Sequence, residues 1–331
     1  MFSSLSRRAT VLVSSSLVVA AAATLAAMQD AHRPTEAAPQ AGAETVPNSG
    51  PADRAPSAAG VHPRPGAVAV CDQAGEDEVI RVPDAAAPEG GRPIWVHRPP
   101  GPDSADLPVL YLLHGSTGTH HDIIDSGVGE AMDEQMCRTG VEFVIAAPFG
   151  QEVGGADTEW GDAVDDDYRI ETFVTEKAIE AVEGEDRRPR ELRAIGGFSM
   201  GGYGAAAIPL RHPDLYAQAI SWAGYFKVDD PSGTFGRDTD AHAPDKLLDD
   251  PEVQDIRFML IEGTEDRTPL QQGSIHGEAE RFAGLLRERG MSVRTLFPSG
   301  GHTYSAWKPT YPDAVAFLTE GWSAAPGPAA D

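Results

Sequence analysis

The segment LRAIGGFSMGGYG (residues 192–204) holds the feature that decides the fold. Its beginning, Leu192–Gly196, is a short apolar run that predicts a buried strand, and Met200–Leu210 predicts a helix. Between them stands Gly197-Phe198-Ser199-Met200-Gly201, a Gly-x-Ser-x-Gly pattern. Its glycines remove the Cβ atoms that would collide across a sharp turn. The segment therefore predicts a strand–turn–helix unit that projects the Ser199 hydroxyl above the end of a sheet.

Similar apolar runs alternate with helical stretches on both sides of this segment. Such alternation implies an α/β fold, with a mostly parallel sheet covered by helices on both faces. We expect apolar and polar residues to alternate in the run at 92–98. The expected strands are Glu78–Val82, Arg92–Arg98, Val109–Leu113, Phe143–Ala147, Leu192–Gly196, Ala217–Trp222, Phe258–Ile261 and Val293–Phe297. The expected helices are Val128–Arg138, Tyr168–Val182, Met200–Leu210, Ile275–Arg289 and Pro309–Leu318.

A serine on such a turn needs a general base, and in this chain order the base is a late histidine. Four histidines follow Ser199: His212, His242, His276 and His302. Only His302 comes directly after the last expected strand, in Pro298-Ser299-Gly300-Gly301-His302. The two glycines allow the loop to turn the imidazole back over the strand ends. We therefore assign His302 as the candidate base.

An acidic residue should orient that histidine, and it should follow the strand Phe258–Ile261. Glu262, Glu265 and Asp266 all compete for this position. Glu262 is still at the end of the strand, whereas Asp266 stands on the loop, where a short carboxylate can reach the Nδ1–H group of a histidine. We favour Asp266, with Glu265 as the next candidate.

Two backbone N–H groups are candidates for stabilising a negatively charged oxygen during the reaction. The N–H of Met200 would lie at the start of the helix after the serine. The turn His114-Gly115-Ser116-Thr117-Gly118 follows an expected strand, and the N–H of Ser116 is the second candidate. We expect His114 to brace this turn rather than to act as a base.

These motifs resemble the esterase D group of α/β-hydrolases. The resemblance rests on LLHG (112–115), GGFSMGG (196–202) and GHTYSAW (301–307), and it spans Gly91 to Leu318. The group includes S-formylglutathione hydrolases, feruloyl and acetyl-xylan esterases, and secreted mycolyltransferases of the antigen 85 type. The resemblance implies an eight-stranded α/β-hydrolase fold and no cofactor. It also implies Ser199, His302 and Asp266 as catalytic residues, with the N–H groups of Ser116 and Met200 as the oxyanion hole.

Composition excludes some classes of partner. The 331 residues contain 51 acidic and 26 basic side chains, which gives a formal net charge of −25. Such a field repels phosphate backbones and anionic lipid surfaces, so we expect no nucleic-acid partner.

The first 28 residues predict an export signal, because Arg7 and Arg8 precede the uncharged run Ala9–Ala27. The paired arginines partly match a twin-arginine signal, and Sec export is the other route. The run is near the short limit for crossing a bilayer, so an uncleaved anchor is the alternative. We expect a secreted or extracytoplasmic protein with no stable membrane insertion after signal cleavage.

The rest of the chain divides by composition. Residues 29–66 are rich in alanine and proline and have no hydrophobic period, which predicts a disordered linker. Residues 67–322 form the expected catalytic domain, and residues 323–331 a flexible tail. Cys71 and Cys137 are the only cysteines, and an exported chain favours a disulfide between them over two free buried thiols.

Two further clusters have a metal-binding alternative. His120-His121-Asp122 stands on a loop where adjacent histidines rarely face one ion, and the acidic residues Asp162 and Asp165–Asp167 lack calcium-loop spacing. We expect neither cluster to bind a metal. The aromatic residues Trp160, Tyr225, Phe226 and Trp307 either border the site or belong to the core.

The function expected from these residues is hydrolysis of a carboxylic ester through an acyl-enzyme. An acyltransferase with the same three residues is one alternative. A catalytically silent binding or cell-wall-associated protein is the other. The expected partner is a small-molecule or carbohydrate-linked ester.

Overall fold

A computed structural model describes residues 71–324, except 88–89, 101–103, 105, 153, 156, 186 and 272. The predicted export signal and linker lie outside the described residues, as do residues 325–331 of the predicted tail. Residues 323 and 324 are described, and they belong to the last helix.

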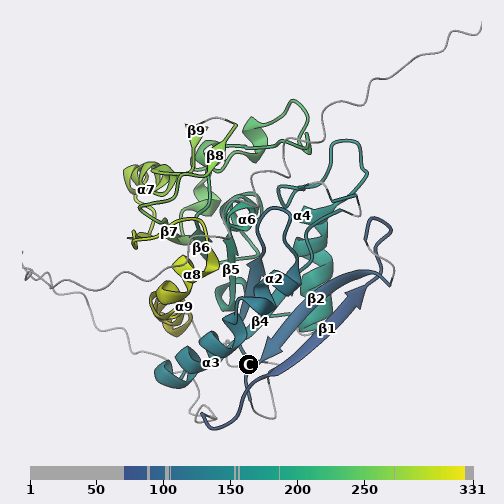
Figure 1. Cartoon of the computed structure of the whole chain (residues 1–331), viewed down its shortest axis with the longest axis vertical. Coiled ribbons are helices and arrows are strands. Elements are labelled where there is room, and N and C mark those ends of the chain that lie inside the picture. The colour runs from purple at the N-terminus through teal and green to yellow at the C-terminus, as the bar shows by residue number, and fades with distance from the viewer. Residues whose placement is uncertain are drawn as a thin grey trace, which may run out of the picture. The chain divides into compact units, whose positions relative to one another are not determined.

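One eight-stranded sheet forms the centre of the fold (Figure 1). Its strand order is β1-β2-β4-β3-β5-β6-β7-β10. Strand β2 pairs antiparallel with both β1 and β4, and the six strands β4, β3, β5, β6, β7 and β10 are parallel to one another. The predicted mostly parallel sheet is confirmed. The strands are β1 (Glu76–Val82), β2 (Arg92–Arg98), β3 (Val109–Leu113), β4 (Val144–Pro148), β5 (Arg193–Phe198), β6 (Gln218–Trp222), β7 (Arg257–Ile261) and β10 (Val293–Leu296). A separate two-stranded hairpin consists of β8 (Pro269–Leu270) and β9 (Gly273–Ser274).

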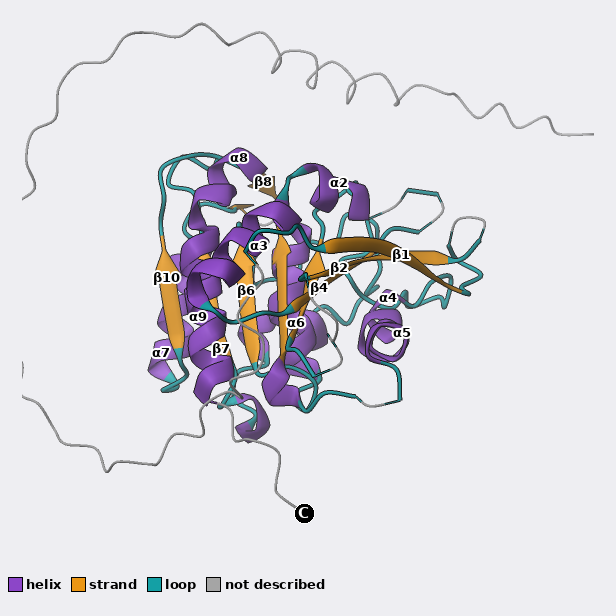
Figure 2. Cartoon of the chain, turned by 90° about the horizontal axis from the view of Figure 1, so that it is seen from below, coloured by secondary structure: helices purple, strands orange, loops and turns teal. Residues whose placement is uncertain are grey.

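Helices cover both faces of this sheet, as the alternating pattern predicts (Figures 1 and 2). Helices α3 and α9 pack against one another on one face. The other face is covered by α6, by α7 and by the continuous segment that runs from α4 to α5. The helices are α2 (His120–Asp125), α3 (Val128–Thr139), α4 (Ile170–Thr172), α5 (Ile179–Glu183), α6 (Met200–Arg211), α7 (Glu278–Glu288), α8 (Tyr304–Trp307) and α9 (Tyr311–Ala324). A π-helical turn, Phe173–Ala178, joins α4 to α5, so the helix expected over 168–182 is continuous from 170 to 183.

The carboxyl ends of the central strands meet at one edge of the sheet. Figure 2 shows the arrowheads pointing to the end where α2, α8 and β8 lie. The register aligns Phe198 at the end of β5 with Trp222, and Trp222 with Ile261 at the end of β7. Residues that directly follow these strands are therefore brought to the same edge, which is where ligands bind in open α/β sheets.

Strand β2 differs from its predicted alternation. All residues from Arg92 to His97 are buried, because β1 and β4 flank the strand and helices cover it. The buried polar residues are paired with specific acceptors: the Arg92 guanidinium donates to the backbone carbonyls of Phe149 and Gln151, at 2.9 and 2.7 Å. Burial of a charged group in this way is tolerated only with such partners.

Helix α2 and the β8–β9 hairpin were not predicted, since both are short and neither carries a hydrophobic period. Helix α2 instead begins with a capping box, in which the Thr119 hydroxyl accepts from the His121 N–H, and the Asp122 carboxylate accepts from the Thr119 N–H at 2.7 Å.

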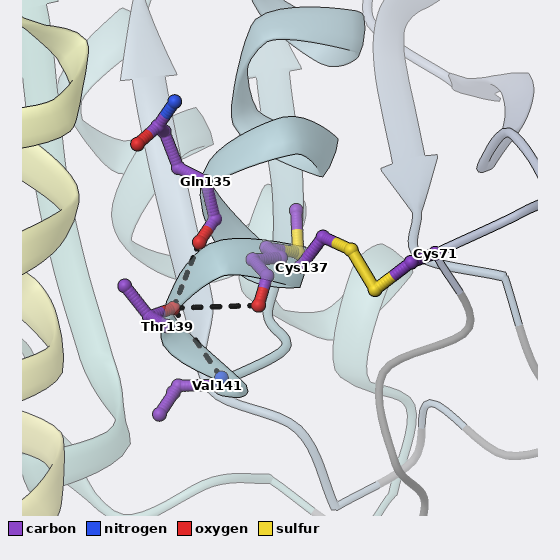
Figure 3. The surroundings of a disulfide bond; sticks show 6 residues. Cys71, Gln135, Cys137, Thr139 and Val141 are labelled. Atoms are coloured by element: carbon purple, nitrogen blue, oxygen red, sulfur yellow. Dashed lines mark hydrogen bonds between the residues drawn. A yellow bond between two sulfur atoms is a disulfide. The ribbon is translucent and has the colours of Figure 1, made fainter.

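The two cysteines form a disulfide (Figure 3), so this prediction is confirmed. Cys71 precedes β1, and Cys137 lies in the last turn of α3, 66 residues later. The bond ties the outer strand pair to a helix that packs on the sheet. In the described part of the chain, no helix has the length and apolar character needed to cross a membrane.

Candidate active site

Ser199 stands on a strained turn between β5 and α6. Its backbone adopts φ 57° and ψ −118°, a region that residues with a side chain rarely occupy. Two glycines make the turn possible. A Cβ atom on Gly197 would lie 2.2 Å from the carbonyl oxygen of Gly201, and a Cβ atom on Gly201 would lie 2.2 Å from that of Leu113. The side chain of Ser199 consequently faces a pocket at the carboxyl edge of the sheet.

His302 comes to the same place from the loop between β10 and α8. Its Nε2 atom lies 2.7 Å from the Ser199 Oγ atom. Gly300 adopts φ 130° in this loop, a conformation that favours glycine. Thr303 then caps α8 through its side chain, and the Trp307 indole of that helix packs edge-on against the imidazole at 5.2 Å between ring centroids. The loop and the short helix thus fix the orientation of the imidazole.

Asp266 holds the other side of the imidazole, with its Oδ2 atom 2.6 Å from His302 Nδ1. Its Oδ1 atom accepts a hydrogen bond from the Thr268 N–H at 2.9 Å. Burial alone would raise the pKa of Asp266, but the hydrogen bonds from His302 and Thr268 outweigh burial and lower the pKa. The carboxyl group is therefore ionised at neutral pH, as an acceptor for Nδ1–H must be.

The two competing acids lie elsewhere. Glu265 has an exposed side chain, and only its backbone N–H contacts the histidine loop, at 3.0 Å from the Gly300 carbonyl oxygen. Glu262 directly follows β7 and is 2% exposed. Burial, with the negative charge of Asp266 as the next cause, raises the pKa of Glu262 to about 9, so this carboxyl group carries a proton at neutral pH. The structure brings Ser199, His302 and Asp266 into one hydrogen-bonded chain.

The turn after β3 lies against the serine. A Cβ atom on Gly115 would be 3.3 Å from the Cβ atom of Ser199, so the turn can approach the nucleophile closely. Thr117 adopts φ 55°, which is strained for a β-branched residue. The Asp157 carboxylate compensates this strain, because it accepts hydrogen bonds from the Thr117 N–H at 2.9 Å and from the Ser116 hydroxyl.

His114 braces the same turn, as predicted. Its Nδ1 atom lies 2.8 Å from the carbonyl oxygen of Gly115, and its Nε2 atom accepts from the Gly150 N–H at 2.9 Å. The Trp160 indole donates to the His114 carbonyl oxygen at 3.1 Å. Burial lowers the pKa of His114 to about 4, so it remains neutral and serves as one donor and one acceptor.

A pocket of about 430 Å³ opens above Ser199. The turn after β3 and the first residue of α6 lie on its wall, which places Ser116 and Met200, the two candidate oxyanion donors, beside the nucleophile. The remaining wall is mixed in character. It consists of Gly115, Thr117, Gly118, Asp122, Glu159, Phe198, Tyr225, Asp229, Pro231, Thr268, Pro269, Leu270, Ile275, His302, Thr303, Tyr304 and Trp307.

The aromatic candidates divide between the pocket and the core. All four are buried, but only Tyr225 and Trp307 line the pocket. Phe226 is stacked on Phe282, with 4.2 Å between ring centroids. Asp157 and Glu159 were not identified from the sequence. They lie in a glycine-containing loop after β4 with no periodic pattern, and their partners come from segments about 40 and 66 residues away.

The clusters considered for metal binding have other partners. Asp122 caps α2, His120 is buried and His121 is exposed. Asp162 accepts hydrogen bonds from the Thr172 N–H and hydroxyl groups. Among the described residues, no group of three or more His, Cys, Asp or Glu side chains is arranged to hold a metal ion.

Comparisons with known proteins identify the family of this chain. A family model described as "Putative esterase" matches residues 85–318, more than two thirds of the chain. The S-formylglutathione hydrolase of Rattus norvegicus is 30% identical over 145 residues, which cover 39% of this chain and 50% of that protein. The chain thus spans about half the length of the curated relatives it matches.

Solved structures show the same fold. A ferulic acid esterase superimposes with a TM-score of 0.64 at 20% identity, covering 75% of this chain and 99% of the other. An S-formylglutathione hydrolase from Agrobacterium tumefaciens gives a TM-score of 0.62 at 18% identity, covering 78% and 97%. These likenesses confirm the predicted α/β-hydrolase fold.

Proposed function

Since the chain belongs to the esterase family whose model spans residues 85–318, we propose that it is a serine esterase that hydrolyses carboxylic esters through an acyl-enzyme. One observation carries the proposal: a continuous chain of hydrogen bonds runs from Ser199 Oγ through His302 to Asp266, with distances of 2.7 and 2.6 Å. This is the arrangement in which a histidine activates a serine hydroxyl.

In the first half of the reaction, Ser199 Oγ attacks the ester carbonyl carbon while its proton moves to His302 Nε2. The carbonyl oxygen becomes negatively charged, and the N–H groups of Ser116 and Met200 would stabilise it. The intermediate then collapses: the bond to the alcohol oxygen breaks, and His302 gives its proton to the departing alcohol. Ser199 is left acylated.

Water completes the cycle. His302 accepts a proton from the water as its oxygen attacks the acyl carbon, and returns the proton to Ser199 Oγ as the acid leaves. Asp266 keeps the proton of the resting imidazole on Nδ1, and its negative charge stabilises the imidazolium that forms in each half-reaction.

A fluorophosphonate probe tests this proposal directly. We expect stoichiometric labelling of the wild-type protein and none of Ser199→Ala, with p-nitrophenyl butyrate hydrolysis lost in the same variant. Failure of the folded wild-type protein to react with the probe would leave a binding role in place of catalysis. Product analysis with an added alcohol distinguishes hydrolysis from acyl transfer, since a transferase would form a new ester.

We further propose that residues 1–28 direct export, that residues 29–66 act as a linker, and that residues 67–322 act as a secreted catalytic domain. The support is the paired arginines before an uncharged apolar run. Mass spectrometry of the protein recovered from the culture medium tests this, and an intact Met1 would argue against cleavage.

A further inference from the structure

The wall of the pocket above Ser199 is rich in carboxyl groups. Asp122 reaches it from α2, Glu159 from the loop after β4, and Asp229 from the loop after β6. The described wall has these three acidic side chains and no lysine or arginine. Three separate segments of the chain thus contribute acidic groups to one small cavity.

Glu159 is held at this wall by the backbone. It is 2% exposed and adopts φ 48°, and Trp160 after it adopts φ 53°, so two consecutive residues with side chains are strained. The Tyr225 hydroxyl donates to the Glu159 carboxyl group, and the Trp160 indole is fixed by its bond to the His114 carbonyl oxygen. Strain of this kind persists only where the surrounding structure imposes it, and it is typical of functional sites.

The field in this part of the pocket is negative. Burial raises the pKa of Glu159 well above its ordinary value, and the charges of Asp157, Asp229 and Asp230 raise it further. Burial likewise raises the pKa of Asp229, and Asp230 adds to this effect. The hydrogen bond that Asp229 accepts from the Gln271 N–H opposes the shift without cancelling it. A negative charge brought into the pocket would meet the same repulsion.

We propose that this pocket selects its ester substrate by charge: it accepts uncharged and cationic esters and rejects esters that carry a carboxylate close to the scissile bond. The inference rests on the proposed esterase function and specifies its substrate class. Acidic groups that line a cleft focus their field on a molecule bound in it.

Three butyrate esters test the proposal with one acyl group: propyl butyrate, which is uncharged, butyrylcholine, which is cationic, and 3-(butyryloxy)propanoate, which is anionic. Each kcat/KM is measured by titration of released acid and divided by the rate constant for hydroxide-catalysed hydrolysis. We expect the anionic ester to be at least about tenfold poorer than the uncharged one. Raising the salt from about 10 mM to about 0.5 M should raise kcat/KM for the anion, lower it for the cation and leave the uncharged ester unchanged.

Asp229→Asn tests whether the pocket, rather than the overall charge of the protein, is responsible. We expect this variant to reduce the discrimination between uncharged and anionic esters by about three- to fivefold. Glu288→Gln is the matched control, with the same change in net charge. Glu288 is exposed in the last turn of α7, just before β10 begins, and so lies at the opposite edge of the sheet. It should leave the ratio unchanged.

The outcomes separate the two proposals. Equal hydrolysis of the anionic and uncharged esters, with no dependence on salt, would overturn the charge selection while leaving the esterase proposal intact. So would an equal effect of Asp229→Asn and Glu288→Gln, because the field would then come from the whole surface. Absence of any ester hydrolysis, together with no labelling of Ser199, would overturn both.

Discussion

Two histidines of this protein, His302 and His97, have the same kind of partner at Nδ1 and different partners at Nε2. His302 Nδ1 lies 2.6 Å from Asp266 Oδ2, and His97 Nδ1 lies 2.7 Å from Asp77 Oδ1. His302 stands on a loop at the carboxyl edge of the sheet, whereas His97 is buried in β2 between two other strands. Judged by the aspartate at Nδ1 alone, either histidine could be the general base of a catalytic triad.

The difference lies at Nε2. For His302, this atom faces the Ser199 hydroxyl at 2.7 Å, and for His97 it faces the Asp133 carboxylate at 2.9 Å. A hydroxyl group can donate or accept, so His302 can exchange a proton with it. A carboxylate only accepts, so His97 must donate from both nitrogens and hold a positive charge.

The pKa of His97 agrees with this interpretation. Burial by itself lowers the pKa, but the hydrogen bonds to Asp133 and Asp77 outweigh burial and raise it. The second partner of a histidine thus decides whether it transfers a proton or keeps one. Variants of the two sites should accordingly separate activity from stability.

Replacing the two imidazoles should give the largest contrast. We expect His302→Ala to lower kcat by about 10⁴-fold or more, since Ser199 loses its base. His97→Ala should retain kcat within a few-fold under conditions where it remains folded. The measurement is p-nitrophenyl butyrate hydrolysis, with circular dichroism as the folding control. If folded His97→Ala lost as much kcat as His302→Ala, the two histidines would not differ in function.

The aspartates at the Nδ1 side should follow the same division. We expect Asp266→Asn to lower kcat by about 10³- to 10⁴-fold with a small change in KM, because an amide favours the wrong imidazole tautomer. Asp77→Asn is the matched change at the other histidine and should leave kcat unchanged. Unchanged kcat in Asp266→Asn would instead direct attention to Glu265.

These contrasts also explain what the sequence could predict. The sequence predicts Ser199 and His302 as nucleophile and base because glycine-rich turns and the order of strands mark them, and it favours Asp266 because this residue stands on a loop after a strand. His97 carries no such mark. Its partners are 20 and 36 residues away, on β1 and α3. The pairing of β1 with β2 brings the first partner to His97, and the position of α3 brings the second.

The same reasoning applies to the rest of the fold. Buried parallel strands produce continuous apolar runs, so β3 to β7 were located to within a residue or two of their bounds. Strand β2 was expected to alternate because its Arg92 and His97 are polar, and pairing with distant residues allows them to be buried. The roles of Asp157 and Glu159 likewise depend on contacts between loops, which leave no local pattern.

Stability should respond most strongly at His97. We expect His97→Ala to lower the free energy of unfolding by about 2–3 kcal/mol at pH 6, because the buried imidazole leaves a cavity and the partly buried Asp133 carboxylate loses its partner, whereas the exposed Asp77 contributes little. The folded-state pKa is above the ordinary value of 6.5, so this contribution is complete below pH 6.5 and is lost as pH rises through the folded-state pKa. Urea unfolding at pH 6 and pH 9 should show a smaller difference between the two proteins at pH 9. A difference that grows with pH would contradict the doubly donating imidazolium.

Glu262 should make the stability of the protein depend on pH, although it contacts neither histidine. Its pKa is about 9 when folded and 4.5 ordinarily, so the folded protein keeps a proton that the unfolded chain releases, and stability falls as pH rises between these values. Glu262→Gln cannot ionise and should be more stable than wild type by about 2 kcal/mol at pH 7, with little difference at pH 4.5. Thermal unfolding across this range provides the measurement. Equal stability at all pH values would show that Glu262 is ionised in the folded protein.

Asp157 should give the smallest effect, because it supports the reaction without contacting either histidine. It holds the strained Thr117 and the Ser116 hydroxyl, so its loss would let the turn that carries Ser116, the proposed oxyanion donor, relax. We expect Asp157→Ala to lower kcat about tenfold with KM nearly unchanged, because an oxyanion donor acts mainly in the transition state. The affinity for a trifluoromethyl ketone should fall in parallel with kcat/KM. Asp162→Ala removes a carboxylate whose partners, Thr172 and Arg169, lie outside the pocket wall, and should change neither quantity. A rise in KM at constant kcat would instead place Asp157 in ground-state binding of the ester.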